Sequence, residues 1–147
     1  MSNKPVHVAL AILYRDGKFL LQLRDNIPGI LYPGHWGFFG GHMERDETPE
    51  VAIGRELLEE ISYAPPQMSK FGLYSDSSVV RHIFHGALDV ELSQLVLGEG
   101  WDMDLLTPEE IRQGEGYSRK AGEMRPLGLI HQQILLDFIK ADLERNC

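Results

Sequence analysis

Apolar and polar positions alternate in short blocks along the first forty residues. Residues 6–14 are apolar and rich in β-branched side chains, which predicts a strand, and the Asp16-Gly17 pair after them predicts a tight turn. The apolar segment 19–24 predicts the second strand of this hairpin. Residues 25–35, rich in Gly, Pro and Asn, predict a loop, and WGFFGG at 36–41 predicts a short strand that ends in two glycines.

The second half of the chain shows more strand patterns and a final amphipathic helix. Segments 69–75 and 79–90 predict strands, LSQLVL at 92–97 a shorter one, and TPEEIRQG at 107–114 a short helix. We expect loops at 98–104 and 115–126. The helix expected at 127–143 has apolar residues at one-sided spacing, namely Ile130, Ile134, Leu135, Phe138 and Ile139. The pattern predicts one α+β domain over 1–147, with a mixed, largely antiparallel sheet covered by helices.

The helix expected between these halves begins after Thr48, an N-cap residue followed by proline, and ends near Ser62, before Pro65-Pro66. At about 100° per residue, its apolar positions share one arc, which we expect to pack on the sheet. These positions are Ile53, Gly54, Leu57, Leu58 and Ile61. The acidic residues Glu56, Glu59 and Glu60 are expected to share the opposite arc.

This acidic arc has two interpretations. Most charged helix faces are simply solvated. However, Glu56 and Glu60 form a like-charge i,i+4 pair that costs on the order of 0.2–0.5 kcal/mol, and no lysine relieves it. Clustered carboxylates without cations suit a hard divalent metal such as Mg²⁺ or Mn²⁺. The residues alone make a metal site plausible and leave both interpretations open.

Composition narrows the possible partners. The formal net charge is −8, with no visible Lys/Arg cluster, which argues against binding a nucleic-acid polymer. No apolar run is long enough to span a membrane, and we expect no signal peptide. The only cysteine, Cys147, cannot form an internal disulfide, which fits a cytoplasmic protein.

The spacing around the acidic helix carries more information than its charge. Gly41, Glu47 and the segment Arg55-Glu56-Leu57-x-Glu59-Glu60 stand at the intervals of the Nudix box, Gly-x5-Glu-x7-Arg-Glu-U-x-Glu-Glu-x-Gly-U, where U is bulky and aliphatic. The chain therefore resembles the Nudix hydrolase family over most of its length. It departs from the box at Ser62, in place of glycine, and at Tyr63. Serine there is expected to cost about 0.5–1 kcal/mol or to change the exit from the helix.

The resemblance implies a Nudix-like α-β-α fold and a Mg²⁺- or Mn²⁺-dependent hydrolysis of a nucleoside diphosphate linked to another group. It implies that Glu56, Glu59 and Glu60 are metal ligands, together with the backbone carbonyl of Gly41. Arg55 would hold Glu56 in place, and Glu47 would join that network. The residue that activates water would be Glu56 or a glutamate from a distant loop. Glu99, between two glycines, is the candidate for the second arrangement; the alternative is an exposed loop acid.

Substrate contacts follow less directly. Arg24 at the end of the second strand is a candidate phosphate ligand, or a surface residue paired with Asp25, and His42 is a candidate substrate neighbour. The larger aromatic residues are each expected in the core rather than against a base: Trp36, Phe39, Phe71, Tyr74 and Phe84.

Two other functions are disfavoured by the same residues, and the nucleotide and the oligomeric state stay open. An isoprenoid diphosphate isomerase would need a nucleophilic cysteine in its pocket, which a terminal cysteine disfavours. A non-catalytic nucleotide sensor usually lacks box glutamates, whereas all of them are present here. The nucleotide itself is not specified by the box. A homodimer is possible, because the family often dimerises.

Overall fold

The computed structural model describes residues 4–145, so Cys147 lies outside the described residues. The chain divides into two compact units. The first contains the chain up to Leu13 together with Phe39–Gly98, and the second contains Tyr14–Phe38 together with the chain from Glu99 onward. Each unit takes one segment from the N-terminal part of the chain and one from later in it. The expectation of one domain over the whole chain stays a prediction.

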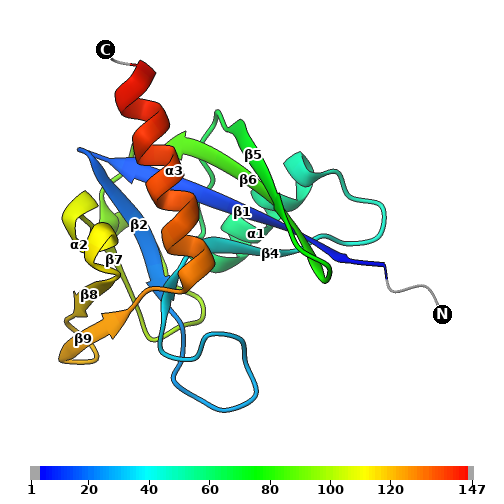
Figure 1. The fold of residues 1–147 in the computed structure, drawn as a ribbon. Helices are drawn as coiled ribbons and strands as arrows, with labels where there is room; N and C mark the ends of the chain where they lie inside the picture. The colour runs from blue at the N-terminus through cyan, green and yellow to red at the C-terminus, as the bar shows by residue number, and fades with distance from the viewer. Residues whose placement is uncertain (1–3, 146–147) are drawn as a thin grey trace. The chain divides into compact units, whose positions relative to one another are not determined.

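The first unit is a sheet with one long helix. Strand β1 (Val6–Arg15), most of which lies in this unit, pairs antiparallel with β4 (Phe39–His42) and also neighbours β6 (Val79–Ala87). Strand β6 pairs antiparallel with β5 (Ser69–Ser75), and the two form the long green hairpin of Figure 1. Helix α1 (Pro49–Ile61) packs on β4. The core of this unit contains fully buried residues from each of these layers, including Ala9, Phe39, Leu57, Ile61 and Phe84.

The second unit is built around β2 (Lys18–Leu23). This strand pairs antiparallel with β3 (Trp36–Gly37) and with β7 (Asp102–Leu106). Strands β8 (Glu115–Ser118) and β9 (Glu123–Pro126) form a separate hairpin. Helices α2 (Pro108–Gln113) and α3 (Leu129–Arg145) contact each other, and the apolar face of α3 is buried at Ile134, Leu135 and Phe138.

The fold class is α+β with mostly antiparallel strands, as the sequence predicts. The turn between β1 and β2 also agrees: Asp16 and Gly17 have φ of 52° and 75°, the positive values that a type I′ turn requires. Trp36, Phe39 and Phe84 are buried, whereas Phe71 and Tyr74 are half-buried. Within residues 4–145, no helix has the length and apolar character needed to cross a membrane.

Three predicted segments are wrong. The segment expected as a strand at 92–97 contains a 3₁₀ helix, η1 (Leu92–Gln94). Glu91 and Gln94 form a capping box, in which the side chain of each residue accepts a hydrogen bond from the backbone amide of the other. The loop expected at 98–104 contains the start of β7, which long-range pairing with β2 fixes. The loop expected at 115–126 is the β8–β9 hairpin, whose turn contains Gly122 at φ 71°.

Candidate active site

Helix α1 begins and ends as its sequence predicts. The Thr48 hydroxyl accepts a hydrogen bond from the Val51 amide at 3.2 Å, and Pro49 occupies the first turn. At the other end, Ser62 adopts the left-handed conformation, φ 57° and ψ 29°, and its amide donates to the Leu58 carbonyl. The serine therefore takes the backbone conformation that glycine usually supplies, so the exit from the helix is kept at the expense of local strain.

The buried face of α1 differs from the expected one. Ala52, Ile53, Leu57 and Ile61 are buried, whereas Leu58 is 59% exposed, so the inclusion of Leu58 in the packing face was wrong. At about 100° per residue, the buried arc runs from Ala52 to Ile61, and Glu56 and Glu60 fall inside it. Both glutamates are half-buried, and only Glu59 is exposed. The carboxylates of Glu56 and Glu60 are thus held against the sheet and do not form a solvated face.

Two glycines of β4 make room for these carboxylates. The Gly40 amide donates to Glu60 Oε1 at 2.8 Å, which satisfies a charge that helix packing has partly buried. A Cβ added at Gly41 would lie 2.9 Å from the Glu56 carboxyl group, so that group rests directly on the Gly41 backbone. Side chains at these two positions would displace the carboxylates, and this explains why the acidic arc can face inward.

Arg55 organises the remaining acids. Its Nε and Nη2 donate to the two carboxylate oxygens of Glu47 at 2.6 and 2.9 Å, which is a bidentate pair. Its Nη1 donates to Glu56 at 3.1 Å and lies 3.3 Å from both oxygens of Glu59. Nη2 also donates to the His42 carbonyl at 3.2 Å. One guanidinium therefore fixes three carboxylates and the backbone of the strand before the helix.

The same contacts set the acidities in the cluster. The hydrogen bond from Arg55, followed by the Glu44 amide, lowers the pKa of Glu47 to about 2. Burial raises the pKa of Glu56 above its ordinary value, and Arg55 only partly opposes this effect. The hydrogen bond to Glu47 raises the pKa of Arg55. At neutral pH, Glu47 and Arg55 form a permanent ion pair, while Glu56 is the carboxylate that binds a proton more readily than usual.

This ion pair predicts acid sensitivity of the fold. Because the pKa of Glu47 is depressed in the folded state, its contribution to the free energy of unfolding is present above about pH 4.5 and lost toward about pH 2. Urea unfolding of wild type and Glu47→Gln should be measured at several pH values over this range. The free energy of unfolding should fall more steeply with decreasing pH in wild type than in the variant. The difference between the two curves isolates Glu47 from Glu56, whose raised pKa acts in the opposite sense. Parallel curves would contradict the assignment.

The chemistry of the acidic cluster suits a hard divalent cation, because its candidate ligands are carboxylate oxygens and a backbone carbonyl. Within residues 4–145, however, no three His, Cys, Asp or Glu side chains are gathered closely enough to hold an ion. Glu56 is bonded to Arg55, and Glu60 to the Gly40 amide. The oxygen ligands and their spacing along α1 suit a divalent cation. Binding would require Glu56 to turn from Arg55, and Glu60 from the Gly40 amide, toward the ion.

The other candidate residues are Arg24, Glu99 and His42. Arg24 and Glu99 belong to the second unit. The Arg24 backbone bonds to His35 and Gly34, and its Nε is buried with no hydrogen-bond partner in the described part of the chain. Glu99 is exposed, and His42 is also exposed, contributing its carbonyl to Arg55. The roles proposed for Arg24, Glu99 and the His42 side chain stay predictions.

Sequence reasoning missed two contributors. The Glu44 amide donates to Glu47 Oε1 at 2.7 Å and so closes the loop before α1. Gly40, rather than only Gly41, takes part through its amide and has φ 135°, a conformation that side-chain-bearing residues avoid. The glycine pair in WGFFGG was the available signal, but which glycine served which carboxylate depends on strand register.

Comparisons with known proteins point to one family. The family model described as NUDIX domain matches residues 4–126. The ADP-ribose pyrophosphatase of Methanocaldococcus jannaschii is 28% identical over 92% of this chain and 75% of its own length. The 8-oxo-dGTP diphosphatase of Proteus vulgaris is 32% identical over 56% of this chain and 73% of its own.

A solved structure supports the fold independently. The NUDIX domain of Shewanella oneidensis NrtR, crystallised with ADP ribose, superposes with a TM-score of 0.68 at 21% identity, over 98% of this chain and 90% of that one. At this identity the likeness concerns the fold alone. The family model covers most of the sequence, and Arg55 joins Glu47 and Glu56 at the spacing of the box, so the chain belongs to the Nudix hydrolase family.

Proposed function

We propose that this Nudix hydrolase cleaves a diphosphate bond in a nucleoside diphosphate linked to another group, with Mg²⁺ or Mn²⁺ as its cofactor. The observation that carries the proposal is the Arg55 network on α1, which holds Glu47 and Glu56 while Glu60 is held by the Gly40 amide. Such an arrangement places several carboxylates beside one strand backbone, where a phosphate alone would be repelled and a divalent cation would be required.

Glu56, Glu59, Glu60 and the Gly41 carbonyl are the groups that would hold the cation. When bound, a divalent ion neutralises phosphate oxygens and lowers the pKa of water. In the reaction, a water oxygen forms a bond to one phosphorus, the bridging P–O bond breaks, and the water gives up a proton. Glu56, whose pKa burial raises, is the proposed acceptor of that proton, and Glu99 is the alternative.

The remaining residues position these groups. Arg55 and Glu47 keep the Glu56 side chain oriented by charge-assisted hydrogen bonds and are positioning residues in this proposal. Arg24 would contact a phosphate. Its buried Nε lacks a hydrogen-bond partner among residues 4–145, and a phosphate oxygen would supply the acceptor for this donor. His42 would lie beside the substrate.

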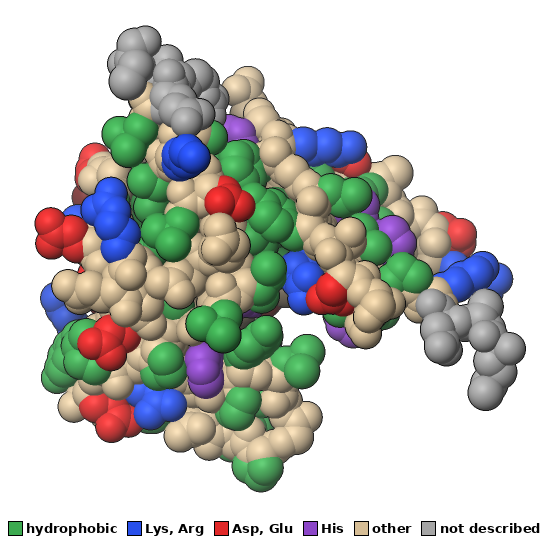
Figure 2. Space-filling view, in the orientation of Figure 1, with side chains coloured by type: hydrophobic (Ala, Val, Ile, Leu, Met, Phe, Trp, Pro, Cys, Tyr) green, Lys and Arg blue, Asp and Glu red, His purple; other side chains and the backbone are tan. Residues whose placement is uncertain are grey.

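The proposed partner is a small nucleotide rather than a polymer or a membrane. On the face drawn in Figure 2, acidic and basic side chains are interspersed and no large basic area appears, in keeping with a net charge of −8. A homodimer and a cytoplasmic location are part of the same proposal, the latter supported by the single cysteine in the sequence.

A substrate panel tests the proposal. The nucleotide products, and any phosphate or pyrophosphate released, should be measured with Mg²⁺ on ADP-ribose, 8-oxo-dGTP, CTP, a nucleotide sugar and a dinucleotide polyphosphate. We expect turnover of at least one compound, abolished by EDTA and restored by added Mg²⁺ or Mn²⁺. Tight nucleotide binding without turnover would support a sensor instead. Activity that EDTA leaves unchanged would contradict the metal-dependent mechanism.

A further inference from the structure

Arg125 of β9 contacts two segments of the second unit that are far from it in the sequence. Its Nε donates to the Gly34 carbonyl of the loop 25–35 at 2.9 Å, while its Nη1 donates to Glu123 of its own hairpin at 3.2 Å. The guanidinium also lies over the ring of Trp101, with Cζ 5.7 Å from the ring centroid, which is a cation–π contact. The Arg125 side chain is only 20% exposed, so protein groups rather than water hold most of it.

The contact depends on the residue types that make it. Gly34 is buried and has φ 67°, and a Cβ at this position would clash with Arg125 Nη2, so the guanidinium occupies space that only glycine leaves. A guanidinium is planar, and its edge can donate a hydrogen bond while its face lies on an aromatic ring. A lysine ammonium cannot make both contacts at once. The arrangement therefore calls for arginine at 125, glycine at 34 and an aromatic residue at 101.

The end of the loop that Arg125 holds is also the part that fixes Arg24. The Gly34 amide is shared between the carbonyls of Arg24 and Asp25, each at 3.2 Å, and the Arg24 amide donates to the His35 carbonyl at 3.0 Å. The buried Nε of Arg24 has no hydrogen-bond partner within residues 4–145. A displacement of Gly34 would therefore move the backbone that aims this donor.

The Trp101 contact holds the segment that carries Glu99. The Trp101 amide donates to the carbonyl of Leu23, the last residue of β2, at 2.8 Å. Its ring lies against Arg125, so the backbone and the side chain of Trp101 are both fixed. Glu99 is exposed two residues earlier, and its freedom is limited by this anchor. Arg125 thus links the two residues of the second unit to which the proposed hydrolysis gives a role.

We propose that Arg125 is a positioning residue, which holds the Arg24 end of the loop 25–35 and the Glu99–Trp101 segment in one arrangement for the substrate. This role rests on the proposed function, in which Arg24 contacts a phosphate. Arg125 itself bonds to protein groups and touches no reacting atom. Arg55 has the corresponding role for the carboxylates of the first unit, so one arginine orders the candidate residues within each unit.

Hydrogen exchange followed by mass spectrometry tests whether Arg125 holds the two segments. In Arg125→Gln, amides of residues 24–35 and 99–102 should exchange at least about tenfold faster than in wild type, because a hydrogen bond from a charged group is lost. Arg125→Lys should also exchange faster, since it keeps the charge without the planar group. Arg119→Gln is the matched control, because Arg119 is exposed in the turn of the same hairpin. Unchanged exchange of both segments in Arg125→Gln would overturn the proposal.

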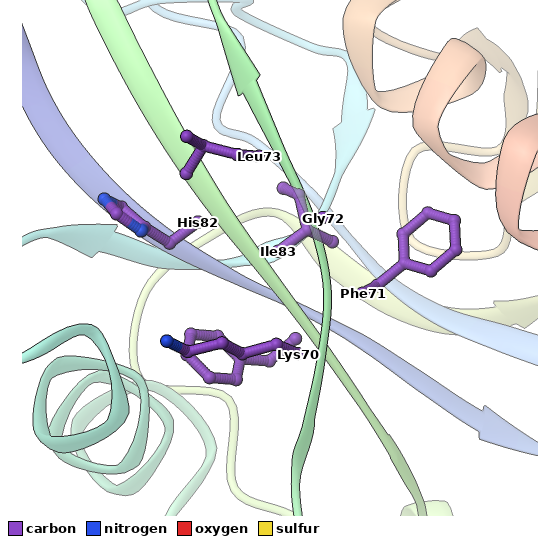
Figure 3. A pocket seen from close by; sticks show the side chains of 7 residues that line it. Lys70, Phe71, Gly72, Leu73, His82 and Ile83 are labelled. Atoms are coloured by element: carbon purple, nitrogen blue, oxygen red, sulfur yellow. The ribbon is translucent and has the colours of Figure 1, made fainter.

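The β5–β6 hairpin is the internal reference, because it belongs to the first unit. Figure 3 shows this hairpin around the hollow on its surface, where Leu73 and His82 are partners in the strand register. Its amides should exchange at the same rate in wild type and in all three variants. An equal acceleration in this hairpin would indicate general destabilisation instead of the release of two segments, and it too would overturn the proposal.

The kinetic constants test whether this positioning matters for hydrolysis. On the panel compound that wild type hydrolyses fastest, Arg125→Gln should raise KM by at least about tenfold and lower kcat by a smaller factor. A loss of folded protein would lower kcat and leave KM unchanged, so KM separates a positioning role from a purely structural one. Arg119→Gln should leave both constants unchanged.

A double substitution tests whether Arg125 acts through Arg24. In an Arg24→Gln background, Arg125→Gln should raise KM by less than about threefold more, since the group that it positions is already absent. An unchanged KM in Arg125→Gln, or effects of the two substitutions that multiply, would overturn the positioning role. A wild type that hydrolyses none of the compounds would overturn the proposed function and this role with it. Exchange is measured without substrate, so it would still show whether Arg125 holds the two segments.

Discussion

Replacing Glu60 by glutamine should reduce the rate of hydrolysis by at least about a hundredfold while leaving the fold intact. Glutamine keeps the carbonyl oxygen that accepts the Gly40 amide at 2.8 Å, so the contact between α1 and β4 survives. It lacks the negative charge that a metal ligand provides, and removal of a ligand costs more than the 10–100-fold typical of a supporting residue. The rate at saturating substrate and the Mg²⁺ dependence should be measured together.

The control for this experiment is Glu109→Gln, an exposed acid in the first turn of α2. It removes the same charge from the second unit and should change neither the rate nor the Mg²⁺ dependence. Glu109→Gln should keep the free energy of unfolding within about 0.5 kcal/mol of wild type, as surface substitutions usually do, and circular dichroism should show that both variants are folded. Equal activity of Glu60→Gln and wild type would rule out Glu60 as a metal ligand.

The sequence predicted α1 closely because its boundary signals are local. Thr48 and Pro49 start the helix, and the Arg55–Glu47 pair follows from the spacing of the box. The direction in which α1 faces was not predictable in the same way. Counting Leu58 as apolar moved the expected buried arc away from Glu56 and Glu60, since hydrophobicity alone places leucine inward and glutamate outward. The buried arc depends on two glycines of β4. Gly41 leaves space for the Glu56 carboxyl group, and the Gly40 amide donates a hydrogen bond to Glu60.

The segments that sequence reasoning missed share a different cause. Strand β7 exists because Asp102–Leu106 pairs with Leu23–Phe19 of β2, residues distant in the chain. The β8–β9 hairpin is short and polar, and it is fixed partly by Ser118, whose buried hydroxyl donates to Asp102 at 2.7 Å. Strand preference in such segments comes from pairing and burial rather than from their own residues. Local pattern therefore predicted the helices better than these late strands.

Replacing Gly40 by alanine should destabilise the protein by about 2–5 kcal/mol, the largest effect on stability that we expect from one methyl group here. Gly40 has φ 135°, and a Cβ at this position would clash with the Ala9 carbonyl oxygen and would lie 2.8 Å from Leu10 Cα. These atoms belong to the backbone of β1, so the pairing of β1 with β4 must open. Because Gly40 also donates to Glu60, hydrolytic activity should fall together with stability.

Gly54→Ala provides the matched comparison, because it adds the same methyl group to the first unit. A Cβ at Gly54 would meet nothing within 4 Å, and the residue lies inside α1, where alanine is favoured over glycine by about 0.5–1 kcal/mol. Urea unfolding should therefore show Gly54→Ala more stable than wild type and Gly40→Ala much less stable. Similar unfolding midpoints for the two variants would mean that β4 can move away from β1 at no cost in stability. In that case the close contact between Gly40 and β1 would not position the carboxylates.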